Sequence, residues 1–504
     1  MKINFSKIFP KKNRRSIYCR LLFFGFLFTA TLSMRKVLWY IPLKGSFNEY
    51  ADVSIYVSDI FILIILASVF IKSEHIIDIM SIIRRCFTGN NARGTVSSFL
   101  IITLPFALII WAAFSLFYAI EPSIGAVFVL KMVELYGVYL LVIFCNVPCE
   151  TNDTKRLSCN FKGMLGGIIF MGVLEAVLGI VQFFKQHSLG LTFIKESVIS
   201  PVLPGVAKVI INNTHYIRAY GTFPHPNILG GFLFVSIILS HLYFRLFYVE
   251  QAYANVRKLG VLLLQYTAII VTFSKSAILG LIIALLYISI VSHGTIRGTQ
   301  IIRRGKIFLK EKVISAKQKS FLGSLLVIGM VSLMMIFSRI NMDTLFFQSL
   351  RERALYQSVV VAIIYKHPIL GISCGQLVIF MAQQSIYPLF DWQLQPVHNI
   401  FLLIWAELGV VGFFIFTLWY VLLAIVVPVK KISFSRNGFS KEKHRTFKEL
   451  YGTYIHALVI GFIPILLFDH YLWDIQQGQI IFWVVMALNA RYIITQIHKI
   501  GNNC

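Results

Sequence analysis

Long apolar runs separated by short polar intervals extend along the whole chain. Most of these runs approach the ~20 residues that an α-helix needs to cross a bilayer. They predict membrane spans at about 21–32, 53–71, 98–118, 124–145, 163–184, 228–248, 259–273, 276–292, 321–338, 399–427, 453–468 and 478–495. We therefore expect an all-α fold, a polytopic membrane protein in which residues 1–504 form one integral-membrane domain of about 12 transmembrane helices.

Basic residues between the spans predict how the chain is oriented. Basic clusters lie before the first span, at 297–319 and at 430–448, and an excess of this kind marks cytoplasmic loops. Both termini are therefore predicted to be cytoplasmic. The basic N-terminal segment imitates a signal peptide, but no small-residue cleavage site follows its apolar run. The interval around Ser274 and Lys275 fits either two short spans or one long broken helix.

Two long polar intervals are predicted to lie on the extracytoplasmic side. The first covers residues 185–226, and the main one covers 339–397, before the tenth helix. Loops of this length in a compact protein usually carry function. We find no internal repeat, low-complexity tract or separate soluble domain. The two outer loops are therefore where functional residues are expected.

The composition supports the membrane class and excludes several others. The chain is 57% hydrophobic and 13% charged, and its mean hydropathy is +0.76, values unlike those of a soluble protein. Its net charge of +26 reflects the basic loops, and no stacking platform or basic groove indicates nucleic-acid binding. The seven cysteines have no metal-ligand or disulfide spacing, so no metal site is expected and Cys374 should be free.

A histidine stands where the main outer loop meets the tenth span. His398 and Asn399 precede the apolar run, and Glu407 lies within it. Ionisable groups at membrane depth are costly, so they indicate function by default. The alternative is a helix start with polar residues at the interface, where a histidine costs little.

The first outer loop ends in a second polar group formed by Arg218, His225 and Asn227. Pro224 and Pro226 favour extended backbone here, and Asn227 is placed to cap the following helix. A guanidinium binds phosphate oxygens in pairs, which favours recognition of an anion at the membrane surface. Anchoring to a lipid headgroup is the alternative reading of Arg218.

Further charged residues extend this pattern. Lys275 interrupts a long apolar interval, either as part of a site or as a snorkelling lysine. Arg351 and Arg353 cannot share one helix face at a spacing of two, so at most one is expected to face a site. Within the spans, Lys131 and Glu134 lie one turn apart, and this spacing predicts an intramembrane ion pair.

The motifs occur in a fixed order along the chain. They are Arg218-x-x-Gly221-Thr222-Phe223-x-His225-Pro226-Asn227; Ser274-Lys275-Ser276; Glu352-Arg353 with His367-Pro368-Ile369-Leu370-Gly371; and His398-Asn399 with Glu407-Leu408-Gly409-x-x-Gly412. In order and placement, over about 185–412, they resemble the O-antigen ligase and O-antigen polymerase superfamily. The stretch 468–473 with Gln477-Gly478 is also similar to the C-terminal part of some bacterial members.

This resemblance implies glycan transfer at the outer face of the cytoplasmic membrane, in cell-surface polysaccharide assembly. Members of the superfamily take the glycan from a polyprenyl diphosphate, usually undecaprenyl diphosphate. They pass it to a hydroxyl of lipid A-core, of another glycan or of a protein. The family is regarded as metal-independent, and no cofactor is implied. The implied partners are the lipid-linked donor, a glycan, lipid or protein acceptor, and membrane lipids, with no nucleic acid.

The resemblance also assigns roles to residues. Arg218 and Arg353 match the arginines that hold the donor diphosphate, and His398 matches the histidine that activates the acceptor hydroxyl. Lys275 stands where many members have arginine, which keeps the charge but loses bidentate binding. His225, Asn227, Asn399 and Glu407 are supporting residues by the same comparison.

The chemistry of the residues supports this reading independently. Fixed cations stabilise a departing diphosphate without a metal, and a neutral histidine accepts the proton of the acceptor hydroxyl. Attack opposite the leaving group predicts inversion at the anomeric carbon. Hydrolysis is disfavoured because glycosidases need two opposed carboxylates and acids are few in the outer loops, chiefly Glu196, Asp343, Glu352 and Asp391.

Two other classes of protein fit the same layout. A transporter or flippase of lipid-linked glycans also has about twelve spans and cytoplasmic termini, but transporters usually show matching half-repeats, which this chain lacks. A glycan-binding scaffold for an export complex is the third possibility. Neither alternative requires the chemistry of His398. Ligase and polymerase differ in their acceptors, and the sequence does not separate them.

Overall fold

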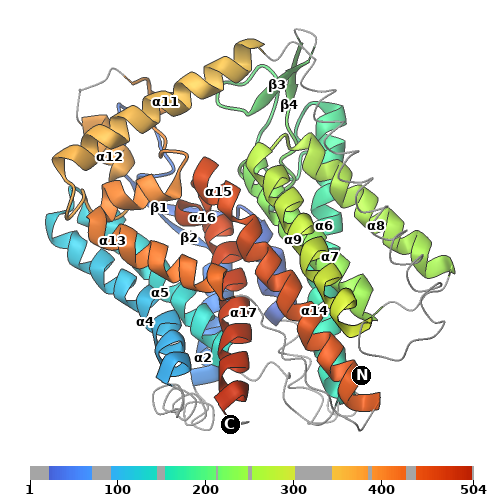
Figure 1. The fold of residues 1–504 in the computed structure, drawn as a ribbon. Helices are drawn as coiled ribbons and strands as arrows, with labels where there is room; N and C mark the ends of the chain where they lie inside the picture. The colour runs from blue at the N-terminus through green and yellow to red at the C-terminus, as the bar shows by residue number, and fades with distance from the viewer. Residues whose placement is uncertain are drawn as a thin grey trace, which may run out of the picture.

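The structure is a computed structural model that describes residues 22–70, 92–144, 154–211, 214–247, 252–300, 343–383, 389–426 and 439–501. After a short apolar helix at Leu22–Thr31, the elements follow in chain order (Figure 1). They are β1 (Arg35–Tyr40), β2 (Asp52–Tyr56), α2 (Val57–Phe70), α4 (Ala92–Ser115), α5 (Pro122–Phe144), α6 (Thr154–Lys185), β3 (Lys208–Ile211), β4 (Thr214–Ile217), α7 (Pro226–Phe247), α8 (Ala252–Val271), α9 (Lys275–Gln300), α11 (Asp343–Lys366), α12 (Leu377–Gln383), α13 (Ile400–Ile425), α14 (Phe439–Gly461), α15 (Ile463–Phe468), α16 (Tyr471–Asp474) and α17 (Gln476–Gly501).

Seven helical segments within the described ranges are long and apolar enough to cross a membrane. They are Val96–Tyr118, Pro122–Phe144, Lys162–Lys185, Pro226–Phe247, Ile400–Ile425, Glu449–Phe468 and Gln476–Gln496. Shorter apolar helices occur at Leu22–Thr31, Val57–Ser68 and Lys275–Val291. The predicted span 321–338 lies outside the described residues. The helical, multi-span class is thus confirmed, whereas the count of about twelve stays a prediction.

Two of the expected spans differ in detail from the structure. The run 53–71 starts as strand β2, and helix α2 begins only at Val57, because the alternating residues before it pair with β1. The run 399–427 is not one straight helix. Gly409 has φ 65° and ψ −173° within α13 and breaks it. The interval around Ser274 is resolved as two helices, α8 and α9, joined by a turn.

The helices form two groups that share a central seam (Figure 1). In one group, α4 packs against α13 and α5, and α5 packs against α17. In the other, α6 packs against α7 and α8, while α9 packs against α14. Helices α14 and α17 contact each other and α7, so they join the groups. The site described below lies where the two groups meet.

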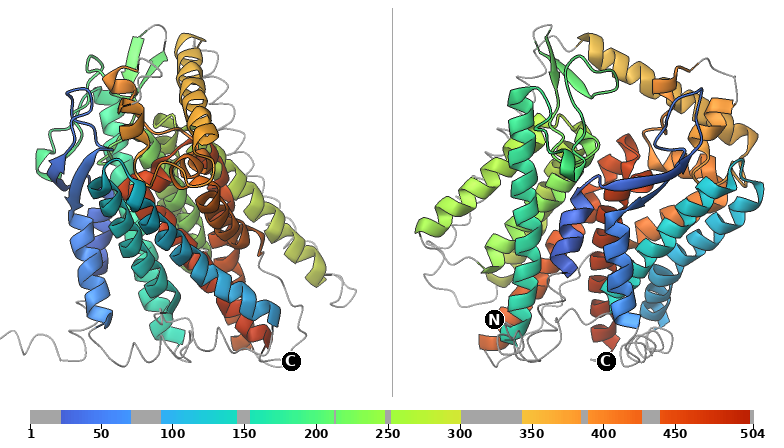
Figure 2. Two further views of the ribbon diagram at one scale, coloured as in Figure 1. Left: turned by 90° about the vertical axis from the view of Figure 1, so that its left-hand side faces the viewer. Right: turned by 180° about the vertical axis from the view of Figure 1, so that it is seen from behind.

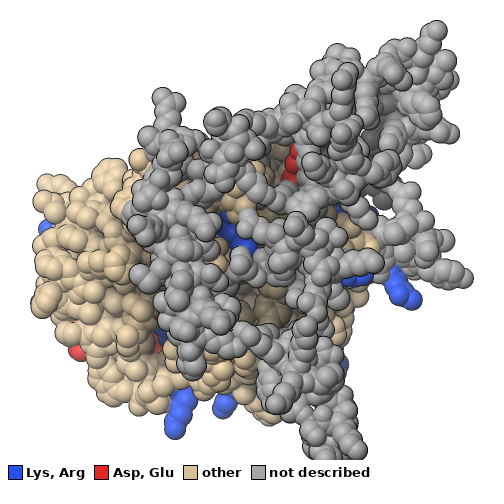
Figure 3. Space-filling view, turned by 90° about the horizontal axis from the view of Figure 1, so that it is seen from below, with Lys and Arg blue, Asp and Glu red and all other residues tan. Residues whose placement is uncertain are grey.

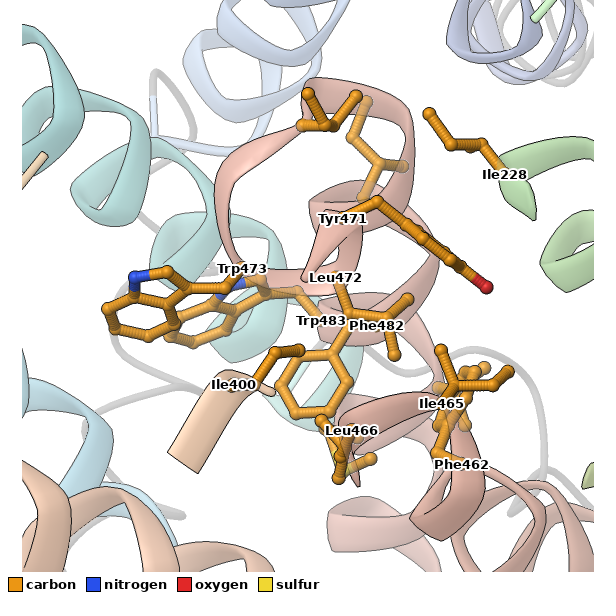
Figure 4. Packing of buried hydrophobic residues seen from close by; sticks show 14 of the residues in the cluster. Ile228, Ile400, Phe462, Ile465, Leu466, Tyr471, Leu472, Trp473, Phe482 and Trp483 are labelled. Atoms are coloured by element: carbon orange, nitrogen blue, oxygen red, sulfur yellow. The ribbon is translucent and has the colours of Figure 1, made fainter. Parts of the chain in front are cut away.

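Aromatic side chains fill this seam. Phe482 lies 5.9 Å from Phe462 and 6.1 Å from Phe416, measured between ring centroids. Figure 4 shows Phe462, Phe482 and Trp473 in one packed layer, with Tyr471 pointing toward α7. All of these side chains are buried, and their burial fixes the chain on either side of Asp469.

Three elements cover the upper end of the bundle. Hairpin β1–β2 stands above α2, and hairpin β3–β4 stands beyond the end of α6 (Figure 2). Helix α11 lies across the top in Figure 1. The predicted outer loops 185–226 and 339–397 therefore contain ordered elements, namely β3–β4 in the first, and α11 and α12 in the second.

Contacts of the intramembrane charges correct one prediction. The ammonium of Lys131 bonds to the carboxylate of Asp59, on α2, rather than forming the predicted ion pair with Glu134. The sequence could not show this partner, because Asp59 lies 72 residues away. Glu175, for which no partner was predicted, accepts hydrogen bonds from Thr222 N at 2.9 Å and Thr222 Oγ1 at 2.6 Å. It therefore holds the turn before α7.

Candidate active site

The candidate site lies at the upper end of the seam, where five segments meet. They are the strand end at Arg218, the start of α7, the turn between α8 and α9, helix α11 with the start of α13, and the break between α15 and α17. Except for α11, whose middle lies here, each segment ends or bends at the site. Their side chains therefore converge although they are far apart in the sequence.

Arg218 is held by two neutral partners. Its Nε donates to Thr272 O at 2.6 Å, and its Nη2 donates to Asn227 Oδ1. Because both acceptors are uncharged, these bonds orient the guanidinium without neutralising it. Burial lowers the pKa of Arg218 to about 10, so the group remains positively charged at neutral pH.

Asn227 joins this arginine to the C-terminal part of the chain. Its Nδ2 donates to Asp469 Oδ2 at 2.7 Å, and its backbone N donates to His225 Nδ1 at 3.1 Å. The sequence predicted that Asn227 caps α7, and this is wrong, because Asn227 lies within the helix and its side chain bonds to Arg218 and Asp469. It sets the orientation of Arg218, Asp469 and His225 together.

His398 lies between two rings. Its centroid is 6.0 Å from that of Tyr356, in a stacked arrangement, and 5.0 Å from that of His470, edge to face. Within the described part of the chain, His398 Nδ1 is buried and has no hydrogen-bond partner. Burial, with the charges of His470, Arg353 and His225, lowers the pKa of His398 well below its usual value. The free protein thus keeps this histidine neutral.

His470 has the opposite electrostatic setting. Its Nδ1 lies 2.9 Å from both oxygens of Asp474, and its backbone N donates to Asp469 Oδ1 at 3.0 Å. Burial alone lowers the pKa of His470, but Asp474 and Asp469 outweigh burial and raise it. The pKa values of the two neighbouring imidazoles are therefore shifted in opposite directions, and the charge of His470 is one cause of the lowered pKa of His398.

Two further cations complete the group. The charge of Arg353, on α11, acts on Arg218, on His398 and on Lys275, the first residue of α9. Arg353 is half-buried, whereas Arg351 is exposed. Three positive side chains close enough to repel one another are costly unless an anion joins them.

The remaining predicted residues support the backbone of the site. Asn399 caps α13 by accepting a hydrogen bond from Leu402 N at 3.0 Å. Glu407 is buried and accepts bonds from Leu377 N at 3.3 Å and from Trp473 Nε1 at 3.4 Å. Its contacts therefore connect α13 to α12 and α16.

Sequence reasoning did not include Tyr356, Asp469, His470 and Asp474 among the site residues. A signal for three of them was present, because an acid–histidine pair and a further acid interrupt the last apolar runs. Nothing in the sequence pairs Tyr356 with His398. As predicted, Cys374 is free, and it is buried.

The fold and the site together define a multi-pass membrane protein with a histidine beside a cluster of cations at one end of its helix bundle. Residues 260–417 match the family model described as O-antigen ligase, and this match confirms the resemblance to the O-antigen ligase and polymerase superfamily. The matched region contains Lys275, Arg353 and His398 and ends before Asp469. No curated protein shows significant similarity to the chain.

Proposed function

We propose that the protein transfers a glycan from a polyprenyl diphosphate, of the undecaprenyl type, to an acceptor hydroxyl. The reaction takes place at the outer face of the cytoplasmic membrane, as an O-antigen ligase or polymerase. One observation carries this proposal: a neutral His398 with a buried, unpartnered Nδ1 lies within the field of Arg353, whose charge also acts on Arg218 and Lys275. This arrangement suits a base that works next to a polyanionic leaving group.

The proposed step is a displacement at the anomeric carbon. The acceptor oxygen forms the new C–O bond while its proton passes to His398. The bond from the anomeric carbon to the phosphate oxygen breaks, and the polyprenyl diphosphate leaves with the electron pair. Attack and departure on opposite sides invert the configuration at this carbon.

The cations stabilise the charge that builds up on the diphosphate. Arg218 is fixed by two hydrogen bonds, so little reorganisation is needed when the anion binds. Arg353 and Lys275 add charge from α11 and α9. In this scheme the side chains supply the positive charge that a metal ion supplies elsewhere, so the reaction is metal-independent.

Donor binding also tunes the base. The positive charges of His470 and Arg353 lower the pKa of His398 in the free protein. A bound diphosphate offsets these charges, so the pKa of His398 rises toward the working pH. The histidine therefore becomes a stronger base when the donor is in place.

The distribution of charge supports the proposed orientation. On the face opposite α11, more Lys and Arg than Asp and Glu side chains are visible (Figure 3). Such a face is cytoplasmic by the positive-inside rule. The site at the other end then opens toward the extracytoplasmic side, and the segments 185–226 and 339–397 form its outer loops.

The test is glycan transfer in lipid nanodiscs by His398→Ala, Arg218→Ala and Arg353→Ala. We expect His398→Ala to lose transfer by about 100-fold or more and to keep donor binding, whereas the arginine variants lose donor binding. His215→Ala and Arg351→Ala are matched controls, because both side chains are exposed. Full activity of all three site variants would overturn the proposal. Donor flipping that depends on the protein would then favour a transporter.

A further inference from the structure

A second, polar cleft of about 110 Å³ is lined by Asp474, the residue that bonds to His470. The β1–β2 hairpin covers it through Arg35, Glu49, Tyr50 and Tyr56, and the outer half of α5 forms its floor. It has room for a group of sugar-ring size rather than for a single water molecule. Nothing in the proposed donor chemistry uses this space.

The cleft adjoins the reacting centre. Pro396, two residues before His398, lines it, and so does Asp474, which bonds to His470. The ring of Tyr50 lies 5.8 Å from that of His470, edge to face. A ligand in the cleft therefore lies close to His470 and to the segment that leads into His398.

The charge of the cleft is opposite to that of the cation cluster. Four carboxyl groups line it, from Glu49, Asp52, Glu407 and Asp474, against two cations. Both cations are already engaged. Arg35 lies 3.4 Å from Asp52 and 3.8 Å from Glu49, and Lys131 bonds to Asp59. Arg35 thus pairs with two of the four carboxyl groups, and Asp474 bonds to His470, so the cleft has no free cation among the lining residues that the structure describes to bind a diphosphate, while its carboxyl oxygens are acceptors for hydroxyl and ammonium groups.

We propose that this cleft binds the acceptor saccharide, and that it selects a neutral or amino-bearing sugar over an acidic one. The inference rests on the proposed transfer reaction and adds the class of acceptor. The histidine pair then separates a cationic donor side from an acidic acceptor side. On this proposal the acceptor hydroxyl reaches His398 from the side of Pro396 and Asp474, and inversion requires that it meet the anomeric carbon opposite the diphosphate.

Filling the cleft tests the proposal by kinetics. Val127 lines it, whereas Leu130, on the same helix, is 65% exposed and does not. With purified donor and acceptor in nanodiscs, we expect Val127→Trp to raise the acceptor KM by about tenfold or more, because the indole occupies space that the sugar would fill. Donor binding should not change. Leu130→Trp should match the parent protein. A rise in donor KM instead of acceptor KM would overturn the proposal.

Charge reversal tests the selectivity by binding alone. Saturation-transfer NMR would compare N-acetylchitotriose, chitotriose and trigalacturonate on the protein in nanodiscs. We expect binding signals from the first two sugars. Glu49→Lys should weaken the binding of chitotriose and allow trigalacturonate to bind. Glu121→Lys, whose side chain is outside the cleft, should change nothing. Equal binding of all three sugars, or no effect of Glu49→Lys, would refute the selectivity. Because this readout needs no transfer, it stands apart from a failure of the proposed reaction.

Discussion

Asn227 occupies a position that few residues can fill. One amide accepts a bond from Arg218 and donates one to Asp469, so it satisfies a cation and an anion that are kept apart. We expect Asn227→Ala to lower the free energy of unfolding by about 1–3 kcal/mol and to raise the donor KM, since Arg218 loses its orientation. Thermal unfolding and donor kinetics measure the two effects.

An aspartate at this position serves as the control. Asn227→Asp keeps an acceptor for Arg218 but places a second carboxylate against Asp469, whose pKa is already raised by burial. A carboxyl with a raised pKa stabilises the fold less as the pH increases. Asn227→Asp should therefore be closest to the parent protein near pH 5 and weakest near pH 8. If the loss of stability in Asn227→Asp did not depend on pH, this account of the contact with Asp469 would be contradicted.

The two histidines predict a pH profile. The ratio kcat/KM reports the ionisation of the free protein and the free donor. It should stay level as the pH falls to about 6.5, the ordinary pKa of histidine, because the pKa of His398 is lowered. The acid limb of kcat should lie at higher pH, since the bound diphosphate raises that pKa. Initial rates between pH 5 and 8.5, with donor below and above its KM, separate the two limbs.

Removal of the neighbouring charge checks the cause of this shift. His470→Gln deletes the positive ring whose centroid is 5.0 Å from that of His398. The pKa of His398 should then rise, and the acid limb of kcat/KM should move to higher pH, whatever the residual rate. An unchanged limb would mean that His398 is not the group that titrates.

At the scale of elements, the break in α13 decides where His398 and Glu407 lie. Gly409 has a positive φ, and a Cβ there would meet the carbonyl of Ile369. The backbone of α13 bonds to the loop before α12 instead, through Ile372 N to Ala406 O and Val410 N to Pro368 O, both at 2.9 Å. The break therefore packs the main outer loop into the bundle.

Substitution of Gly409 should separate α13 from the loop before α12. We expect Gly409→Ala to cost about 3 kcal/mol or more and to reduce both folded yield and transfer. Gly260→Ala in α8 is the control, because no atom lies within 4 Å of a Cβ at that exposed position. The role given to this break would be contradicted if Gly409→Ala gave the same yield as the parent protein and remained monodisperse in detergent.

The elements also show how far the sequence could predict the fold. Apolar length identified most spans, because a helix must be long and apolar to cross a bilayer. The same property hid strand β2 and the break at Gly409, since both lie inside apolar runs. The partners Lys131 and Asp59 come from different helices, and periodicity along one helix cannot reveal such a pair.

The site was predictable to a similar extent. Arg218, Arg353 and His398 stood out because charged and titratable groups are rare at the edges of apolar runs, and the structure brings them together. The bond between Asn227 and Asp469 spans 242 residues, so no local pattern contains it. The acidic cleft combines the first hairpin with the last helices, and only the fold places them side by side.

For the whole molecule, the decisive property is the side on which the site opens. Val202, 85% exposed, lies beyond the C-terminal end of α6, and Gly163, also exposed, lies at the N-terminal end of the span Lys162–Lys185 within that helix. Lys185 lies 22 residues after Gly163, which is about 33 Å at helical rise and matches the thickness of a bilayer. Single cysteines at these positions therefore report opposite sides of the membrane.

In a variant that keeps only the buried Cys374 of its native cysteines, we expect Val202→Cys to react with a membrane-impermeant maleimide on intact spheroplasts. Gly163→Cys should react only after permeabilisation. The buried Cys374 supplies the unreactive background. The opposite pattern would place Arg218 and His398 in the cytoplasm. A lipid-linked glycan that has been delivered to the outer face could not reach them there, so the proposed donor would be wrong even if the catalytic histidine were right.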